Sequence, residues 1–162
     1  MFSSPLLRLA ERVLADARAQ KLRIATAESC TGGLIAAALT EIPGSSDVFD
    51  RGFVTYSNRA KSDMLGVPGD MIADMGAVCE AVARTMAEGA VANSNAHMAV
   101  AVTGIAGPGG GTAMKPVGLV HIAAYRENRS ILHVAEHFGD IGRSEVRMKT
   151  VESALNLLLR MM

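Results

Sequence analysis

The sequence predicts one α/β domain with three layers, in which helices cover both faces of a mixed, mostly parallel sheet. Amphipathic segments with helical periodicity alternate with short apolar segments. The segment "HMAVAVTG" at 97–104 is apolar almost throughout, which is typical of a strand buried on both faces. Two more strand-like segments, 117–125 and 130–138, are separated only by a turn-like stretch and indicate an antiparallel pair.

The N-terminal half begins with an amphipathic helix over 3–21, which Ser3 or Ser4 can cap and in which Pro5 suits the first turn. The apolar, partly β-branched "LRIATA" predicts a strand. The remaining elements of this half are a helix at 32–42 that ends at "PGSS", a strand at 51–56 and a short helix at 58–65 that Ser57 can cap.

The C-terminal half adds a helix at 80–94, the buried strand at 97–104 and a long glycine-rich loop at 105–116. The antiparallel pair follows, and a closing helix spans 144–161. No internal repeat or long linker divides the chain, so we predict a single domain over 1–162.

Composition limits the classes of function. The chain has 162 residues with 16 basic and 16 acidic side chains, and this balance argues against a nucleic-acid or anionic-membrane partner. Its two cysteines match no disulfide framework and no metal-ligand spacing. No signal peptide or membrane-spanning segment is visible, so we expect a soluble cytoplasmic protein. We also expect a homodimer or higher homo-oligomer, which the apolar "LIAAAL" allows, although burial in the core explains that segment equally well.

Three of the predicted strands end in polar, hydroxyl-bearing positions: Glu28-Ser29, Tyr56-Ser57 and Thr103-Gly104. If these strands are parallel, the three ends lie at one edge of the sheet, where open α/β sheets bind ligands. The alternative is that strand ends are polar because they lead into loops.

Ser29 lies between a strand and a helix, within "AESCTGG". We expect the N–H groups of Thr31, Gly32 and Gly33 to point outward unpaired, where they would favour a phosphate or the oxyanion of an acyl-transfer intermediate. The alternative is that Ser29 or Thr31 is a plain helix N-cap.

A serine nucleophile needs a base, and the four histidines are poorly placed, since they fall within or beside predicted strands. His133 and His137 would stand roughly 13 Å apart along an extended chain, too far to bind one metal. Lys61 falls early in the short helix after Tyr56, near the same sheet edge as Ser29. Helix position and partial burial would lower its pKa and favour the neutral amine, but a solvated surface lysine is the alternative.

The glycine-rich "GIAGPGGG" offers successive N–H groups that can form an anion-binding nest, although a disordered connection fits equally well. Arg143 and Arg147 lie four residues apart near the start of the closing helix. Arginines there oppose the helix dipole, which indicates a bound anion such as phosphate, while an ordinary charged helix face is the alternative.

Five blocks in order resemble the C-terminal domain of the CinA competence/damage-inducible family: "TAESCTGG", "GSSDVFDRGFVTYSNRAK", "GAV", "AVTGIAGPGGG" with "KPVG", and "GDIGRSEVR". The resemblance runs from about residue 5 to residue 160. Standalone members of that family are nicotinamide-nucleotide amidases, which deamidate nicotinamide mononucleotide. The resemblance therefore implies an amidase with this substrate and with no metal or cofactor.

The resemblance also implies roles for individual residues. Ser29 would be the nucleophile, Lys61 its base with help from Tyr56, and Thr103 a further member of the catalytic group. Arg143 would bind the substrate phosphate, with Arg147 as the alternative, and Gly104 and Gly107 of the glycine-rich segment would line the substrate site with Thr31, Gly32 and Gly33. Cys79 departs from the serine that many relatives carry in the "GAV" block.

Three alternatives stay open at this point. Cys30 is adjacent to Ser29 near a helix N-terminus, where a thiolate nucleophile would be stabilised. The whole chain could instead be a non-catalytic nucleotide-binding module or an amidase for another small carboxamide.

Overall fold

A five-stranded mixed sheet with strand order β2-β1-β3-β4-β5 forms the centre of the protein. The structure, a computed structural model, describes all residues from 1 to 162. β1 pairs in parallel with both β2 and β3, while β4 is antiparallel to β3 and β5. β5 therefore runs in the same direction as the first three strands. The strands are β1 (Ile24–Glu28), β2 (Phe49–Val54), β3 (Met98–Gly104), β4 (Leu119–Arg126) and β5 (Leu132–His137).

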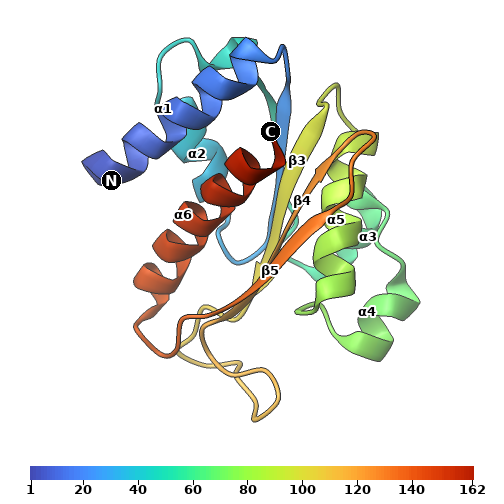
Figure 1. Cartoon of the computed structure of the whole chain (residues 1–162). Helices are drawn as coiled ribbons and strands as arrows, with labels where there is room; N and C mark the ends of the chain where they lie inside the picture. The colour runs from blue at the N-terminus through green and yellow to red at the C-terminus, as the bar shows by residue number, and fades with distance from the viewer.

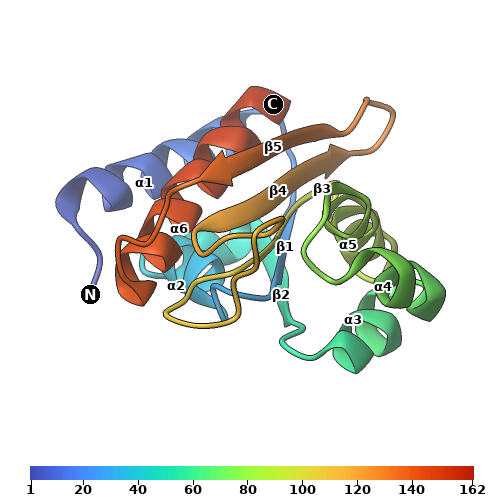
Figure 2. The same ribbon diagram turned by 90° about the horizontal axis from the view of Figure 1, so that it is seen from below.

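Six α-helices cover the two faces of this sheet. In two perpendicular views, α1, α2 and α6 lie on one face and α3, α4 and α5 on the other (Figures 1 and 2). This arrangement confirms the predicted three-layer α/β fold. The helices are α1 (Ser4–Ala19), α2 (Leu34–Thr40), α3 (Asn58–Leu65), α4 (Gly69–Met75), α5 (Glu80–Ala92) and α6 (Arg143–Met161), with a 3-10 turn at Ser45–Asp47.

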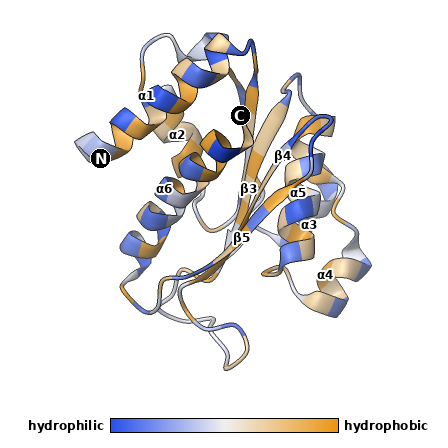
Figure 3. Cartoon of the chain, viewed as in Figure 1, coloured by the Kyte–Doolittle hydropathy of each residue, from blue (hydrophilic) through white to orange (hydrophobic).

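The central strand β3 separates two hydrophobic cores. Its larger residues Met98, Val100 and Val102 belong to the core under α1, α2 and α6. The alternate residues Ala99 and Ala101 belong to the core under α5, because successive side chains of a strand point to opposite faces. Figure 3 shows that β3 is hydrophobic along its length, whereas α1 and α6 carry both hydrophobic and hydrophilic residues. Each helix thus buries one side and exposes the other.

Helix ends follow the predicted signals in two cases. Ser57 caps α3, its Oγ accepting from the Ala60 N–H at 3.0 Å, and α3 spans the predicted 58–65. Ser3 caps α1, and Pro5 lies in its first turn. In contrast, α4 was not predicted, because it follows Pro68 and has no side-chain cap.

The start of α2 differs from the prediction. The helix begins at Leu34, since Gly32 and Gly33 adopt positive φ angles of 57° and 100° and stay outside it. Glycine adopts these angles without steric cost. The segment from Ser29 to Gly33 is therefore a separate turn between β1 and α2, and this turn carries the candidate nucleophile.

None of the helices combines the length and the apolar character that crossing a bilayer requires.

Candidate active site

The carboxyl ends of β1, β2 and β3 lie at one edge of the sheet, because β1 is parallel to both of its neighbours. A cavity of about 300 Å³ opens at this edge. Its wall combines residues from the turn after β1, the segment between β2 and α3, the loop before α5, the glycine-rich loop and the start of α6. Those residues are Ser29, Cys30, Tyr56, Asn58, Lys61, Ala77, Val78, Thr103, Gly104, Ile105, Ala106, Gly107, Gly109, Gly110 and Arg143.

Ser29 and Lys61 form the centre of this site. The Lys61 Nζ lies 2.9 Å from the Ser29 Oγ, although the two residues come from different elements. Lys61 is only 1% exposed, so it is not a solvated surface lysine. Its Nζ also donates to the Thr55 carbonyl at 2.7 Å and lies 3.5 Å from the Tyr56 carbonyl.

The surroundings of Lys61 make its charged form less favourable than it is in water. Burial lowers the pKa of Lys61 below its ordinary value. A neutral amine has two N–H groups and one lone pair. The Thr55 and Tyr56 carbonyls can accept from these two N–H groups, and when the amine is neutral its lone pair can face the Ser29 hydroxyl.

Tyr56 and Arg143 form a second pair at the cavity mouth. The Tyr56 side chain is 60% exposed, and its hydroxyl accepts from Arg143 Nη2 at 2.8 Å. Arg143 Nη1 donates to the Gly107 carbonyl at 2.7 Å. Tyr56 therefore meets Lys61 through its main-chain carbonyl, while its phenol helps to position Arg143.

Thr103 holds the opposite wall of the cavity. It is buried at the end of β3, and its Oγ1 donates to the Ala77 carbonyl at 2.9 Å. Ala77 and Val78 line the cavity, so this bond fixes the loop before α5 beside the Ser29–Lys61 pair. The hydroxyl makes no hydrogen bond to Ser29 or Lys61.

Three residues assigned to substrate binding from the sequence, Thr31, Gly32 and Gly33, lie outside the cavity lining. The expectation that all three N–H groups point outward unpaired is wrong, because the Gly32 N–H donates to the Ser29 carbonyl at 3.0 Å. Thr31 is buried, and its hydroxyl donates to Glu28. These residues shape the turn instead of lining the cavity.

The two arginines of α6 have different positions. Arg147 Nε donates to the Cys30 carbonyl and its Nη2 to the Thr31 carbonyl, each at 3.1 Å. Arg147 thus braces the turn from outside, and it is absent from the cavity lining that includes Arg143.

A family model described as the CinA C-terminal domain matches residues 6–162, nearly the whole chain. The chain belongs to the CinA family. The competence/damage-inducible protein CihA from Agrobacterium tumefaciens is 55% identical with a TM-score of 0.97, covering 99% of this chain and 97% of that one. A CinA superfamily protein from Escherichia coli is 32% identical with a TM-score of 0.92, covering 100% and 94%.

Longer members of the CinA family also match this chain. A CinA-like protein from Akkermansia muciniphila is 49% identical over 152 residues, which cover 93% of this chain and 36% of that protein. The chain thus spans about a third of the length of the curated relatives it matches.

Glu28 is a residue of this CinA domain that the sequence analysis did not assign. Its side chain is 0% exposed, and its carboxylate accepts four hydrogen bonds. The hydroxyls of Thr26 and Thr31 donate at 3.1 and 2.7 Å, and the N–H groups of Ile35 and Ala36 at 2.8 and 2.9 Å. The Glu28 carboxylate therefore takes the place at the N-terminus of α2 that an external anion could otherwise fill. One feature of the sequence could have indicated this role. The N-cap residue of α2 is a glycine, Gly33, which has no side chain to cap the helix, so another residue must supply the cap.

We expect Glu28→Ala to destabilise the CinA domain by roughly 3 kcal/mol or more, since each buried donor left unpaired costs about 1–3 kcal/mol. Urea unfolding followed by circular dichroism measures the change. Thr40→Ala is the matched control, because its exposed hydroxyl also bonds α2 but leaves no buried donor unpaired. Equal midpoints for both variants would contradict the structural role of Glu28.

Cys30 is a less suitable nucleophile than Ser29. It is buried, and burial raises the pKa of its thiol to about 11. The Cys30 thiol therefore stays protonated near neutral pH, while the adjacent serine has a buried amine within hydrogen-bond distance.

The histidines lie away from the cavity lining. His121 and His133 are stacked with ring centroids 5.2 Å apart, and their Nδ1 and Nε2 atoms are 3.0 Å from each other. Burial lowers the pKa of both. They are sheet side chains on β4 and β5, as the sequence predicts, and no group of three or more His, Cys, Asp or Glu side chains forms a metal site.

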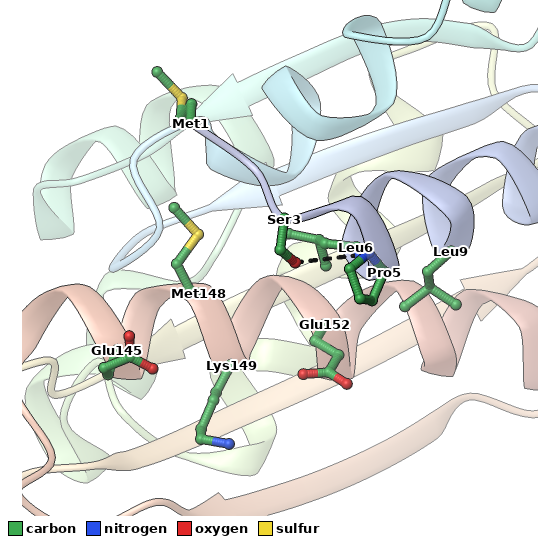
Figure 4. Close-up of a pocket in the computed structure, with 9 residues that line it drawn as sticks. All are labelled: Met1, Ser3, Pro5, Leu6, Leu9, Glu145, Met148, Lys149 and Glu152. Atoms are coloured by element: carbon green, nitrogen blue, oxygen red, sulfur yellow. Dashed lines mark hydrogen bonds between the residues drawn. The ribbon is translucent and has the colours of Figure 1, made fainter.

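A larger cavity of about 430 Å³ lies where the start of α1 meets α6 (Figure 4). Its polar side chains are Ser3, Glu145, Lys149 and Glu152. The only hydrogen bond drawn among them is the Ser3 cap on Leu6. Because this cavity holds no nucleophile next to a buried base, the smaller cavity at Ser29 is the candidate active site.

Proposed function

We propose that this CinA domain is an amidohydrolase that converts nicotinamide mononucleotide and water into nicotinic acid mononucleotide and ammonia. The observation that carries the proposal is the buried Lys61 Nζ at 2.9 Å from the Ser29 Oγ. Burying an amine without an ionic partner costs stability, and perturbed amines are common among catalytic bases. The substrate comes from the family resemblance, and the cavity provides the reacting groups.

In the first half of the reaction, neutral Lys61 accepts the Ser29 hydroxyl proton while Oγ bonds to the carboxamide carbon. The carbonyl electron pair moves onto oxygen and forms a tetrahedral intermediate. When it collapses, the C–N bond breaks, and the nitrogen takes the proton from Lys61 and leaves as ammonia. An ester between Ser29 and the nicotinoyl group remains. A base in this role contributes on the order of 10²–10⁴ in rate.

The second half uses the same two residues. Lys61 accepts a proton from a water molecule, whose oxygen bonds to the ester carbon. The bond from that carbon to the Ser29 Oγ then breaks, and Oγ takes the proton back from Lys61. The product is nicotinic acid mononucleotide, whose new carboxyl group gives its proton to water or to the released ammonia, and the enzyme returns to its starting state.

Arg143 is the group proposed to bind the 5′-phosphate. Its guanidinium is at the cavity mouth and is held by the Gly107 carbonyl and the Tyr56 hydroxyl. A positioned guanidinium recognises phosphate through charge-assisted hydrogen bonds. This contact would favour the nucleotide over free nicotinamide.

We expect Arg143→Ala to raise the KM for nicotinamide mononucleotide roughly tenfold to a hundredfold with a smaller change in kcat, because a hydrogen bond to a charged group contributes about 1.5–3 kcal/mol. Steady-state kinetics measures both constants. Arg147→Ala is the matched control on the same helix, and we expect it to lower thermal stability because it releases the Cys30 and Thr31 carbonyls. A larger KM effect from Arg147→Ala would reverse the assignment.

Ammonia release from purified protein and nicotinamide mononucleotide, with chromatographic identification of the product, tests the proposed function. Turnover would support the amidase. Binding of the nucleotide without ammonia at high protein concentration would favour the alternative, a nucleotide-binding module that uses Arg143 and the glycine-rich loop. Release of ammonia only from other small carboxamides would retain the chemistry and change the substrate.

A further inference from the structure

The proposed reaction creates a negatively charged oxygen twice, and the site needs hydrogen-bond donors for it. Such donors usually lie 2.7–3.1 Å from the oxyanion, and removing one costs about 10²–10³ in rate. Lys61 is occupied with the Ser29 proton at this stage. The donors must therefore come from other groups in the cavity wall.

The N-terminus of α2 cannot supply them. The Ile35 and Ala36 N–H groups donate to the buried Glu28 carboxylate. The Gly32 N–H donates to the Ser29 carbonyl, and the Ser29 N–H donates to the Val102 carbonyl at 3.1 Å. The Thr31 and Gly33 N–H groups have no partner in the chain, but neither residue lines the cavity. Within "AESCTGG", the Cys30 N–H is therefore the main-chain donor left in the cavity wall.

Three buried loop residues of the cavity wall, Cys30, Ala106 and Gly107, have a main-chain N–H without a partner. Of the last two, Ala106 directly follows Ile105, whose main chain is held by hydrogen bonds. Cys30 and Ala106 both line the cavity, and each residue is only 5% exposed. Neither N–H donates a hydrogen bond to another residue. The Cys30 N–H interacts only with its own sulfur, which is a weak acceptor. Buried N–H groups are rarely left unpaired, so unpaired N–H groups on both sides of one cavity indicate that a ligand atom binds to them.

The sheet brings these two donors to the same place. Cys30 follows β1 and Ala106 follows β3, and the two strands are parallel neighbours. The Ala106 segment is fixed, since the N–H of the preceding Ile105 donates to the Leu119 carbonyl at 2.9 Å and its carbonyl accepts from Gly118 at 2.8 Å. A rigid donor needs little reorganisation when charge develops, which is the condition for strong electrostatic stabilisation.

We propose that the main-chain N–H groups of Cys30 and Ala106 form the oxyanion hole of this enzyme, an inference that rests on the proposed amidase function. One donor directly follows the nucleophile and the other comes from a separate loop, a combination that also serves other serine hydrolases. Both N–H groups bind the oxygen that carries the charge in each tetrahedral intermediate. They make no contact with the leaving nitrogen.

An aldehyde analogue, nicotinamide mononucleotide with CHO in place of the carboxamide, tests this assignment. The Ser29 Oγ adds to the aldehyde carbon, and the carbonyl oxygen becomes the oxygen of a tetrahedral hemiacetal. In ¹⁵N-labelled protein, we expect the amide protons of Cys30 and Ala106 to shift downfield and to exchange more slowly. Thr31, Gly32 and Gly33 serve as internal controls, and Ser29→Ala should show none of these changes.

The outcomes separate the two proposals. A Ser29 adduct detected by mass with downfield shifts at Thr31 to Gly33 and none at Ala106 would leave the amidase intact and overturn the oxyanion hole. Absence of any adduct on Ser29 would overturn both. Shifts at Cys30 and Ala106 together with the adduct would support both.

A kinetic experiment tests the Ala106 donor by itself. Replacing Ala106 with lactic acid through an expanded genetic code converts its N–H into an ester oxygen and keeps the methyl side chain. We expect kcat to fall by about 10²–10³ with little change in KM. The same replacement at Ala135, on the edge strand β5, is the control for the ester itself. Equal kcat values for the two ester variants would overturn the assignment of Ala106.

Discussion

Ser29→Ala should abolish ammonia release from nicotinamide mononucleotide, by a factor on the order of 10⁶ in kcat or to below detection, because no other group in the cavity can form the acyl intermediate. The alanine keeps the turn between β1 and α2, since the hydrogen bonds of this turn use main-chain groups and Glu28. Nucleotide binding measured by calorimetry should therefore persist.

Cys30→Ala separates the two candidate nucleophiles. We expect this variant to turn over substrate, since the Cys30 thiol is buried and protonated near neutral pH. Mass spectrometry of the quenched reaction should show the nicotinoyl group on the peptide that contains Ser29 in both the native protein and Cys30→Ala. A dead Cys30→Ala beside an active Ser29→Ala would assign the chemistry to the thiol.

The topology of the fold was predictable because its signals are local. The continuous apolar character of β3 indicates a strand covered on both faces, and the short connection between β4 and β5 leaves an antiparallel pair as the simple solution. The small helix α4 was missed, since Pro68 starts it without a side-chain cap. Its position depends instead on Ile72, which packs into the core under α5.

The part of the candidate site that depends on the order of the strands could be predicted from the sequence. Ser29, Tyr56 and Thr103 follow parallel strands that are direct neighbours, so topology alone brings them to one edge. Whether Arg143 or Arg147 faces the cavity could not be decided from their spacing. The two arginines are one turn apart on α6, and their contacts distinguish them: Arg143 bonds Gly107 and Tyr56 at the cavity mouth, whereas Arg147 bonds the Cys30 and Thr31 carbonyls.

The electrostatics of the nucleophile turn could not be predicted from the motif. "AESCTGG" presents a helix start that invites an external anion, but Glu28 reaches forward and fills it. This depends on the positive φ angles of Gly32 and Gly33, which turn the chain so that the Glu28 carboxylate meets the first free N–H groups of α2. As a consequence, the Ile35 and Ala36 N–H groups at the start of α2 are not available to a substrate oxygen.

The lowered pKa of Lys61 affects both the proposed activity and the stability of the protein. Folding removes the Lys61 amine from water and places it against Ser29 and two carbonyls. Because burial lowers the pKa of Lys61 in the folded state, the unfolded chain binds more protons between that lowered pKa and about 10.4, and stability rises with pH across this window. The stability cost is largest below the lowered pKa, where the folded protein must carry a buried charge.

Lys61→Met should therefore lower kcat by about 10²–10⁴ or more and remove the acidic limb of the pH profile. In the native enzyme, kcat/KM should fall about tenfold per pH unit below the lowered pKa of Lys61, because only the neutral amine accepts the Ser29 proton. The stability difference between Lys61→Met and the native protein should shift in favour of the native protein as pH rises toward about 10.4, measured by urea unfolding at several pH values. Lys149→Met, an exposed lysine on α6, is the control that should change neither profile. If Lys61→Met retains the acidic limb, another group supplies the base, and the short contact between Lys61 and Ser29 is structural.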